Sequence, residues 1–366
     1  MKILHITTGA NYAVITQYVR FVNENFDINE HTFLILDKQE NIPIELSDRS
    51  NTIVIDINKG KQFNTILSYM MKSDLIILHS LCLSIYQQLF LLFNPFILQK
   101  TVWVAWGMDL YQWKREDNGS ILYKGRNLIS FIFRKKINYF VGIFPPDIDY
   151  FKNTFKSRAK TFYASYVGGL YNPLYEKDLN LISLAEKRVN NDCINIQIGH
   201  SCSSILNHRQ VLEALQKFKS ENINIYIPLS YGDMEYGNQV EEYAETLFGD
   251  KVVCIREMMA KEEYMDFLST IDIAIFNTTR QIGLGNITPL LYMEKKIFMP
   301  AGSIMYEYYK SVGVQVFDYN QLNNMEFRHF VSPVDTSNAK KYIETQVKNK
   351  ELKIGMWTNV FNAVMK

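Results

Sequence analysis

The 366-residue sequence has little of what marks several large protein classes. Its four cysteines form no Cys-x-x-Cys pair and stand beside no histidine at zinc-ligand spacing, so we expect reduced thiols rather than disulfides or a structural zinc site. Seventeen glycines and nine prolines are too few for a fibrous or linker-dominated chain. Lys and Arg number 39 against 38 Asp and Glu, and this net charge of +1 is unlike that of a protein that coats nucleic acid. We therefore expect no nucleic-acid partner.

A long hydrophobic run is also absent. The most apolar stretch, 83–98, contains two Gln, an Asn and a Pro, and it is shorter than the roughly 20 residues that a membrane-spanning helix needs. At the N-terminus, His5, Thr7 and Thr8 interrupt the apolar residues, and no small-residue cleavage site follows, as a signal peptide would require. These features predict a cytoplasmic protein that is soluble or peripheral to the membrane.

The familiar nucleotide-binding motifs are missing as well. No Gly-x-Gly-x-x-Gly follows the first predicted strand, and no Gly-x-x-x-x-Gly-Lys-Ser/Thr occurs. These absences count against NAD-dependent enzymes and P-loop NTPases. We identify no metal-binding motif and expect neither a metal ion nor another cofactor.

What the sequence does contain is an alternation of short apolar runs with amphipathic stretches, which is typical of parallel sheets covered by helices. In the first half we predict strands at 2–7, 32–37, 52–56, 75–79, 101–106 and 139–143, with helices near 12–25, 60–72, 83–93, 119–136 and 147–156. In the second half we predict strands near 193–198, 223–229, 251–255, 272–276 and 296–300, with helices near 207–219, 235–248, 261–270 and 287–295.

This pattern predicts an α/β protein with two Rossmann-like, doubly wound domains that face each other across a cleft. We place the N-terminal domain at 1–165 and a linker at 166–192, where the pattern loosens. The C-terminal domain spans 193–333. The last segment, 334–366, is predicted to form two helices that pack back on the N-terminal domain.

Two turns in the second half have the chemistry of phosphate-binding sites. Gly199, His200 and Ser201 follow a predicted strand and precede a helix, so their backbone N–H groups and hydroxyl could bind an anion, although an ordinary capped turn has the same pattern. The second turn lies between another strand and a helix, and its candidate residues are Arg280, Gln281, Gly283, Gly285, Asn286 and Thr288. Two glycines permit close approach of a diphosphate to the backbone, and the arginine supplies a charged fork.

The first half carries candidate acceptor-side residues at the ends of its strands. Asp109 follows a strand and a glycine, where it could act as a general base or, equally well, cap a helix. Four further residues are expected on the same rim: Gly9, His79, Trp106 and Tyr111.

One segment bears on membranes. Residues 123–140 combine five Lys and Arg with aromatic and aliphatic side chains and contain no acid. Such a helix can lie in an anionic headgroup region, although a helix that packs its apolar face on the sheet has the same pattern.

Four runs together resemble glycosyltransferase family 56, the transferases that add Fuc4NAc (4-acetamido-4,6-dideoxygalactose) from a dTDP donor to the lipid-linked precursor of enterobacterial common antigen, also called 4-alpha-L-fucosyltransferases. Trp-Gly-Met-Asp-Leu-Tyr at 106–111 is similar to the family's W-G-x-D-L-Y, and 280–285 is similar to its R-Q-x-G-I-G. The turn at 199–201 and the run 227–232 are the other two, with His200 in place of the family's Asn and Ser230 in place of a Gly.

The resemblance implies a GT-B glycosyltransferase of bacterial surface polysaccharide synthesis, active without a metal ion at the inner face of the cytoplasmic membrane. Its partners would be a nucleotide-diphospho-sugar donor, dTDP-linked as in the family, and a polyprenyl-diphosphate-linked saccharide acceptor, with 123–140 touching the membrane surface. Tyr231 would lie beside the base or diphosphate in the donor site. Asp109 would be the base of an inverting reaction or would hold the acceptor in a retaining one. Three alternatives stay open: a UDP- or GDP-sugar transferase for another glycan, an enzyme like the non-hydrolysing sugar-nucleotide epimerases, and a catalytically silent membrane-associated binding protein.

Overall fold

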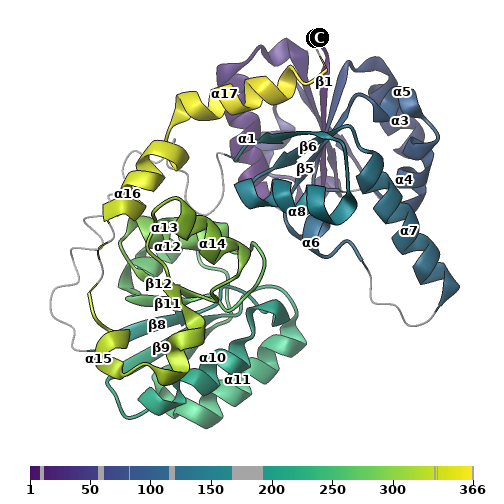
Figure 1. Ribbon diagram of the computed structural model, residues 1–366. Coiled ribbons are helices and arrows are strands. Elements are labelled where there is room, and N and C mark those ends of the chain that lie inside the picture. The colour runs from purple at the N-terminus through teal and green to yellow at the C-terminus, as the bar shows by residue number, and fades with distance from the viewer. Residues whose placement is uncertain are drawn as a thin grey trace. The chain divides into compact units, whose positions relative to one another are not determined.

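The structure, a computed structural model, describes residues 1–8, 12–56, 62–81, 83–114, 120–166, 193–333, 335 and 337–364. The chain divides into two compact units (Figure 1). One contains the described residues of Met1–Gly169 and Lys350–Lys366, and the other contains those of Leu170–Asn349. The C-terminal segment therefore changes units between Asn349 and Lys350, later than the boundary at 334 expected from the sequence. Apart from Tyr166, the predicted linker 166–192 lies outside the described residues.

The first unit is built on a seven-stranded parallel sheet with the order β3-β2-β1-β4-β5-β6-β7. Its strands are β1 (Ile3–Thr8), β2 (His31–Leu36), β3 (Thr52–Ile55), β4 (Leu75–His79), β5 (Thr101–Ala105), β6 (Tyr139–Gly142) and β7 (Lys160–Tyr163). Its helices are α1 (Tyr12–Asn25), α2 (Ile44–Ser47), α3 (Gln62–Lys72), α4 (Ile85–Leu92), α5 (Pro95–Leu98), α6 (Met108–Tyr111), α7 (Ile121–Lys136), α8 (Pro145–Phe155) and α17 (Lys350–Phe361).

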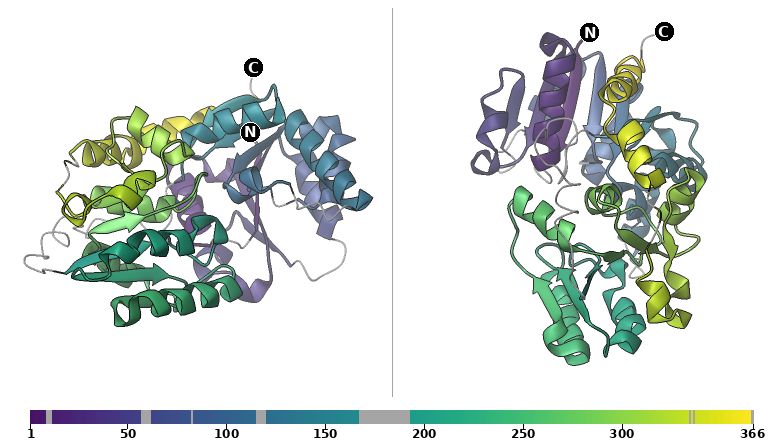
Figure 2. Two further views of the ribbon diagram at one scale, coloured as in Figure 1. Left: turned by 60° about the horizontal axis from the view of Figure 1, so that its bottom comes forward. Right: turned by 90° about the vertical axis from the view of Figure 1, so that its left-hand side faces the viewer.

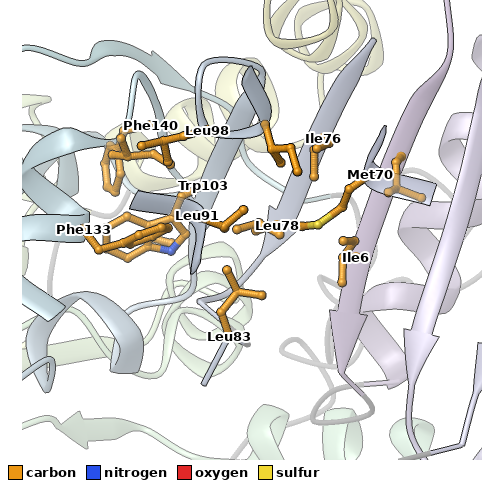
Figure 3. Packing of buried hydrophobic residues seen from close by; sticks show 14 of the residues in the cluster. Ile6, Met70, Ile76, Leu78, Leu83, Leu91, Leu98, Trp103, Phe133 and Phe140 are labelled. Atoms are coloured by element: carbon orange, nitrogen blue, oxygen red, sulfur yellow. The ribbon is translucent and has the colours of Figure 1, made fainter. Parts of the chain in front are cut away.

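Strand alternation separates two apolar layers on the faces of this sheet. Side chains such as Ile6, Leu78 and Trp103 point to one face and pack against α3, α4, α5, α7 and α8 (Figure 3). On the other face, the His5 ring stacks on Phe33 at 4.3 Å and meets aromatic side chains of α1 and α17. The last helix of the chain thus completes the core of the first unit.

The second unit repeats the design with a six-stranded parallel sheet of order β10-β9-β8-β11-β12-β13. Figure 2 shows this unit, coloured from teal to yellow, in two further views. Its strands are β8 (Ile194–Ile198), β9 (Ile223–Pro228), β10 (Val252–Ile255), β11 (Ile273–Ile275), β12 (Lys296–Met299) and β13 (Phe317–Asp318). Its helices are α10 (His208–Leu215), α11 (Met234–Phe248), α12 (Lys261–Thr270), α13 (Leu284–Tyr292), α14 (Ile304–Ser311), α15 (Phe327–Phe330) and α16 (Ser337–Tyr342), followed by the π-helical turn η8 (Ile343–Val347).

Both sheets have the strand order of a doubly wound Rossmann fold. In such sheets the order reverses beside the first strand, between β1 and β4 in one unit and between β8 and β11 in the other. Ligands of open parallel sheets bind at the carboxyl ends of the strands at this reversal. The predicted α/β class is confirmed, and the predicted phosphate turns lie at the reversal in the second unit.

Candidate functional site

Two loops meet at the carboxyl ends of β8 and β11. The amide of Gly199 donates a hydrogen bond to the carbonyl of Ile275 at 2.9 Å, which ties the first loop to the neighbouring strand. Gly283, at the end of the second loop, lies against the imidazole of His200: a β-carbon on Gly283 would be 3.0 Å from both Cε1 and Nδ1 of that ring. The two predicted phosphate turns therefore form one surface, with His200 as the contact between them.

Gly199 is required by both backbone conformation and space. Its φ of +61° lies in the left-handed region, and an added β-carbon would stand 2.7 Å from Nε2 of His208. His208 begins α10 and is fully buried, with its Nδ1 atom 3.2 Å from the hydroxyl of Tyr236. The first turn thus packs directly on the start of the following helix.

The loop after β9 is hydrogen-bonded to the loop after β8. Cys202 donates its amide hydrogen to the carbonyl of Tyr231 at 2.8 Å, and Asp233 donates to the carbonyl of Cys202 at 3.0 Å. Burial raises the pKa of Tyr231, while its hydrogen bond with the buried Ser201 opposes that shift. With 47% of Tyr231 exposed, its ring can contact a bound molecule.

The start of α13 has the features of an anion-binding site. Gly283 precedes the helix with φ +73° and supplies no side-chain cap, so the helix begins with backbone N–H groups aimed at the carboxyl edge of the sheet. Gly285 is exposed and Thr288, one turn later, is half-buried. Asn286 is buried instead, because its Oδ1 atom accepts a hydrogen bond of 2.6 Å from the hydroxyl of Tyr264. Asn286 therefore supports the helix start from within.

Arg280 and Gln281 flank this helix start. Burial, with smaller effects from the nearby His208 and the Arg280 guanidinium, lowers the pKa of His200 to about 4, so the ring is neutral at pH 7. Among the described residues, the buried Oε1 atom of Gln281 and Nδ1 atom of His200 have no hydrogen-bond partner. A half-buried cation and these buried polar atoms give the loop the composition of a binding site rather than of a plain turn.

No acid stands in the loop or in the helix. Between Asp272 and Glu294 the sequence contains neither Asp nor Glu. Glu294 is exposed and follows the end of α13, just before β12 begins, so it belongs to the amino edge of the sheet. The helix that faces the carboxyl edge therefore offers no carboxylate to the hydroxyl groups of a ribose.

In the first unit, Asp109 binds three backbone and side-chain donors. Its Oδ2 atom accepts from Leu81 N and Trp103 Nε1, each at 2.7 Å, and its Oδ1 atom accepts from Trp106 N at 2.8 Å. A carboxylate has about four acceptor positions. Asp109 thus joins the loops after β4 and β5, and the acceptor capacity that these three bonds leave is on Oδ1.

Tyr111 and His79 lie on the same edge but make different contacts. The hydroxyl of Tyr111 donates to Oδ1 of the fully buried Asp147 at 2.6 Å. Burial raises the pKa of Asp147 to about 7 against the opposing effect of that hydrogen bond. His79 is 1% exposed and is hydrogen-bonded to the hydroxyl of Tyr166, which also accepts from Trp106 Nε1 at 2.9 Å. Gly9 lies outside the described residues.

Two site residues were missed by sequence reasoning. Tyr264 reaches Asn286 from α12, and Tyr166 reaches His79 and Trp106 from beyond β7. Neither belongs to a motif, and each is brought to the site only by the packing of distant elements.

An Asp-x-Asp spacing at 147–149 falls in α8, where Asp147 is buried and Asp149 is exposed, so the two carboxylates do not converge.

Helix α7 contains most of the predicted basic segment 123–140, and its charges are not all on the surface. Arg134 is 4% exposed, donates to the carbonyl of Asp109 at 2.9 Å and lies over the Trp103 ring. The exposed cations are Lys124, Lys135 and Lys136. Large apolar side chains are also exposed on α7, on and just after the adjacent α4, and on α5. They are Tyr86, Phe93, Phe96, Ile121, Leu122 and Leu128, which are between 58% and 84% exposed.

Comparison with known proteins gives a family match and a fold match. A family model described as 4-alpha-L-fucosyltransferase, glycosyl transferase group 56, matches residues 32–330. The Alr3699/HepE protein of Anabaena, solved in complex with UDP-glucose, has a TM-score of 0.70 at 12% identity, covering 99% of this chain and 100% of that one. A glycosyltransferase of Rickettsia africae ESF-5 has a TM-score of 0.64 at 14% identity over 100% and 98% of the two chains. WaaG, a glycosyltransferase involved in lipopolysaccharide biosynthesis, has a TM-score of 0.64 at 11% identity over 99% of each chain.

Two Rossmann-type units, matched over their full length by these structures, define a glycosyltransferase of the GT-B fold. The chain belongs to glycosyltransferase family 56, the 4-alpha-L-fucosyltransferases. The predicted fold class, family and enzyme class are confirmed, and the family match favours a transferase over an epimerase-like enzyme or a silent binding protein. Within the described part of the chain, no helix is long and apolar enough to cross a membrane.

Proposed function

We propose that this glycosyltransferase transfers Fuc4NAc or another fucose-like deoxyamino sugar from a dTDP donor to a saccharide linked to polyprenyl diphosphate, at the inner face of the bacterial cytoplasmic membrane. The observation that carries the proposal is the packing of His200 on Gly283, which joins two phosphate-binding turns at the reversal point of the second sheet. The donor binds there, and the acceptor saccharide binds at the carboxyl edge of the first sheet.

The leaving nucleoside diphosphate develops negative charge as the sugar departs. The N–H groups at the start of α13, the turn at Gly199 and the Arg280 side chain supply fixed positive ends of dipoles and a cation to that charge. These groups act as the electrostatic clamp of the reaction, and no cofactor enters the proposal.

The choice of dTDP rests on the missing carboxylate. A ribose is held by hydrogen bonds from its 2′ and 3′ hydroxyls, and α13 presents no acid to receive them. A deoxyribose has no 2′ hydroxyl, so it loses fewer hydrogen bonds than a ribose does in a site without an acid. This favours a deoxynucleotide donor over UDP- and GDP-sugars.

Asp109 is the proposed base if the reaction inverts configuration. Its Oδ1 atom, which receives one hydrogen bond from Trp106, is the oxygen available to a sugar hydroxyl. If the reaction retains configuration, Asp109 holds the acceptor loops in place through its bonds to Leu81 and Trp103.

The exposed side chains of α7, of α4 and the residue that follows it, and of α5 are the proposed membrane contact. Six large apolar side chains and three lysines gather on neighbouring helices, a combination that binds anionic headgroups. Cosedimentation with phosphatidylglycerol vesicles tests this contact. Leu122→Ser should weaken it, whereas Ile44→Ser, at a position 75% exposed on α2, should not.

Thermal stabilisation by nucleotides tests the donor site. A ligand at a hundred times its dissociation constant adds about 2.7 kcal/mol of stability. We expect dTDP to raise the melting temperature most, dUDP next, and UDP and GDP least, and Arg280→Ala to abolish the effect. Arg328→Ala, an exposed arginine on α15, is the matched control. Stronger stabilisation by UDP or GDP would overturn the dTDP assignment while leaving the transferase intact.

A further inference from the structure

Three buried histidines cross one face of the first sheet in a diagonal line. His31, His5 and His79 come from the neighbouring strands β2, β1 and β4. Nδ1 of His31 lies 2.9 Å from Nε2 of His5, and Nδ1 of His5 lies 3.0 Å from Nε2 of His79. In the strand register, His31 is level with Ile3, two residues before His5, so the line climbs toward the carboxyl edge.

The line continues to the edge where the acceptor is proposed to bind. Nδ1 of His79, the last residue of β4, is hydrogen-bonded to the hydroxyl of Tyr166, and the same hydroxyl accepts from Trp106 Nε1. Trp106 follows β5 directly, and its amide donates to Asp109. Tyr166 is half-buried, whereas the three histidines are buried, so the residue at this end of the chain is the more exposed one.

All three imidazoles are neutral at pH 7. Burial lowers the pKa of His79 to about 3 and that of His31 to about 4, and burial together with its two histidine neighbours lowers the pKa of His5. A neutral imidazole has one donor nitrogen and one acceptor nitrogen. In a chain of neutral imidazoles, all the hydrogen bonds are therefore donated in the same direction along the chain. The position of the hydrogen on His79 then decides whether the Tyr166 hydroxyl donates to Nδ1 of His79 or accepts from it.

Helix α17 holds Tyr166 from the same face. The buried Lys353 donates to Ser165 Oγ at 2.7 Å, and Trp357 Nε1 donates to the carbonyl of Ser165 at 3.2 Å. The Trp357 ring lies 5.7 Å from the Tyr166 ring. Backbone, ring and hydroxyl are thus each fixed by separate contacts.

We propose that Tyr166 is a substrate-binding residue that accepts a hydrogen bond from a hydroxyl group of the acceptor saccharide, and that the His79–His5–His31 chain positions it for that role. Tyr166 donates its own hydrogen to Nδ1 of His79, so its oxygen faces the substrate as an acceptor. His79 then donates from Nε2 to His5, and His5 donates from Nε2 to His31. The inference rests on the acceptor site of the proposed function.

Tyr166→Phe tests the contact with substrate. The assay uses radiolabelled dTDP-Fuc4NAc as donor and the polyprenyl-diphosphate-linked saccharides extracted from enterobacterial membranes as acceptor. One uncharged hydrogen bond corresponds to roughly 2- to 13-fold. We expect the acceptor KM to rise by about 5- to 10-fold, with the donor KM and the stabilisation by dTDP unchanged.

Tyr18→Phe is the matched control. Tyr18 is fully buried in the same aromatic cluster, and among the described residues its hydroxyl has no hydrogen-bond partner. Removal of the Tyr18 hydroxyl should leave the donor KM and the acceptor KM unchanged. If Tyr166→Phe behaves like Tyr18→Phe, the inference is wrong. If the wild-type protein transfers no sugar, the proposed function fails instead, and the two failures are distinct.

The positioning role has its own test. His5→Phe keeps a ring on Phe33 but breaks the chain in its middle, so the acceptor KM should rise about 3- to 10-fold. In a Tyr166→Phe background the same substitution should have no further effect on that KM, because the hydroxyl that the chain orients is already gone. Additive effects would show a general structural role and would overturn the positioning.

Imidazole nitrogen NMR on the wild-type protein reads the direction of the chain without any substitution. The sequence has six histidines, so the spectrum can be assigned. We expect His5, His31 and His79 all to be neutral with the hydrogen on Nε2. Hydrogens on Nδ1 in the three rings would make Tyr166 an acceptor from His79 and would overturn the proposed direction.

Discussion

The imidazole of His200 lies against the α-carbon of Gly283, so close that a β-carbon at 283 would stand 3.0 Å from both Cε1 and Nδ1. The contact joins the loop after β8 to the start of α13, two segments more than 80 residues apart in the chain. Because His200 is buried and neutral, it acts as a spacer that sets the distance between the two turns. The geometry of the proposed donor site therefore depends on this contact.

Gly283→Ala should therefore weaken donor binding more than its effect on stability explains. The left-handed φ of +73° costs a non-glycine residue about 1–2 kcal/mol, and the added methyl group also pushes the His200 ring away. We expect a lower melting temperature and at least a 10-fold loss of affinity for dTDP, measured by calorimetric titration.

Gly313→Ala separates the two effects. Gly313 has a similar φ of +77°, but nothing lies within 4 Å of an added β-carbon. It should lower the melting temperature alone and leave the affinity for dTDP unchanged. Equal losses of affinity in the two variants would show that the contact with His200 does not shape the site.

Asp109→Asn should destabilise the first unit by about 1–3 kcal/mol. The amide retains one acceptor oxygen but turns an N–H₂ group toward donors at Leu81 and Trp103 or at Trp106, which are then left without an acceptor. Urea unfolding measures the loss, and Asp149→Asn, an exposed acid on α8, is the control. Unchanged stability would contradict the hydrogen bonding seen at Asp109.

The same variant bears on the chemistry. For an inverting reaction with Asp109 as base, kcat should fall by about 100-fold or more. For a retaining reaction the acceptor KM should change more than kcat. The anomeric configuration of the product, read by proton NMR, decides which comparison applies.

The strands and the two glycine turns that follow β8 and β11 could be predicted from the sequence because their signals are local. Buried parallel strands are continuous apolar runs, and a glycine turn between a strand and a helix is visible within ten residues. β7 was missed because Lys160 is exposed and the rest of the strand is half-buried, which leaves no apolar run. Helix α14, capped by Ser303, was missed where the sequence pattern predicted no element.

Contacts between distant residues could not be predicted in this way. The sequence places His79 at the end of a strand, but it does not show that strand register brings His5 and His31 into line with it. Nor does a basic segment reveal that Arg134 turns inward to the Asp109 loop. These contacts depend on which strands are neighbours, which single-sequence patterns leave open.

Asp147 should make the protein less stable as pH rises toward neutrality. Its carboxyl has a folded pKa of about 7 against an ordinary value of 3.8, so between these values the folded state keeps a proton that the unfolded state has lost. The free energy of unfolding therefore falls by up to about 1.4 kcal/mol per pH unit in this window and is level above it.

Thermal melting of Asp147→Asn from pH 5 to pH 8 checks the prediction, since the variant should lose this contribution to the slope. Tyr111→Phe should extend the window upward, because the hydrogen bond it removes lowers the pKa of Asp147. An unchanged pH profile in both variants would mean that Asp147 does not hold its proton in the folded state.

His208 should make the protein more stable as pH rises through the acid range, which is opposite to the effect of Asp147. It is fully buried, and burial lowers its pKa to about 4 from the ordinary 6.5. Between these values the unfolded chain binds a proton that the folded chain does not, so stability rises with pH up to about 6.5 and is lost as pH falls toward 4. The shift corresponds to a contribution on the order of 3 kcal/mol over the window.

His208→Gln removes the titrating ring but keeps a polar side chain that can reach the hydroxyl of Tyr236. Urea unfolding at pH 4.5, 5.5 and 6.5 measures how the free energy of unfolding rises with pH. In the variant this rise should be smaller than in the wild type by the contribution of about one proton. His31, His79 and His200, whose pKa values burial also lowers, continue to supply slope in the variant. His329→Gln, at an exposed position on α15, controls for the loss of an imidazole as such. If the two variants show the same slope, His208 binds a proton as readily in the folded protein as in the unfolded chain, and the packing of Gly199 against its neutral Nε2 must be revised.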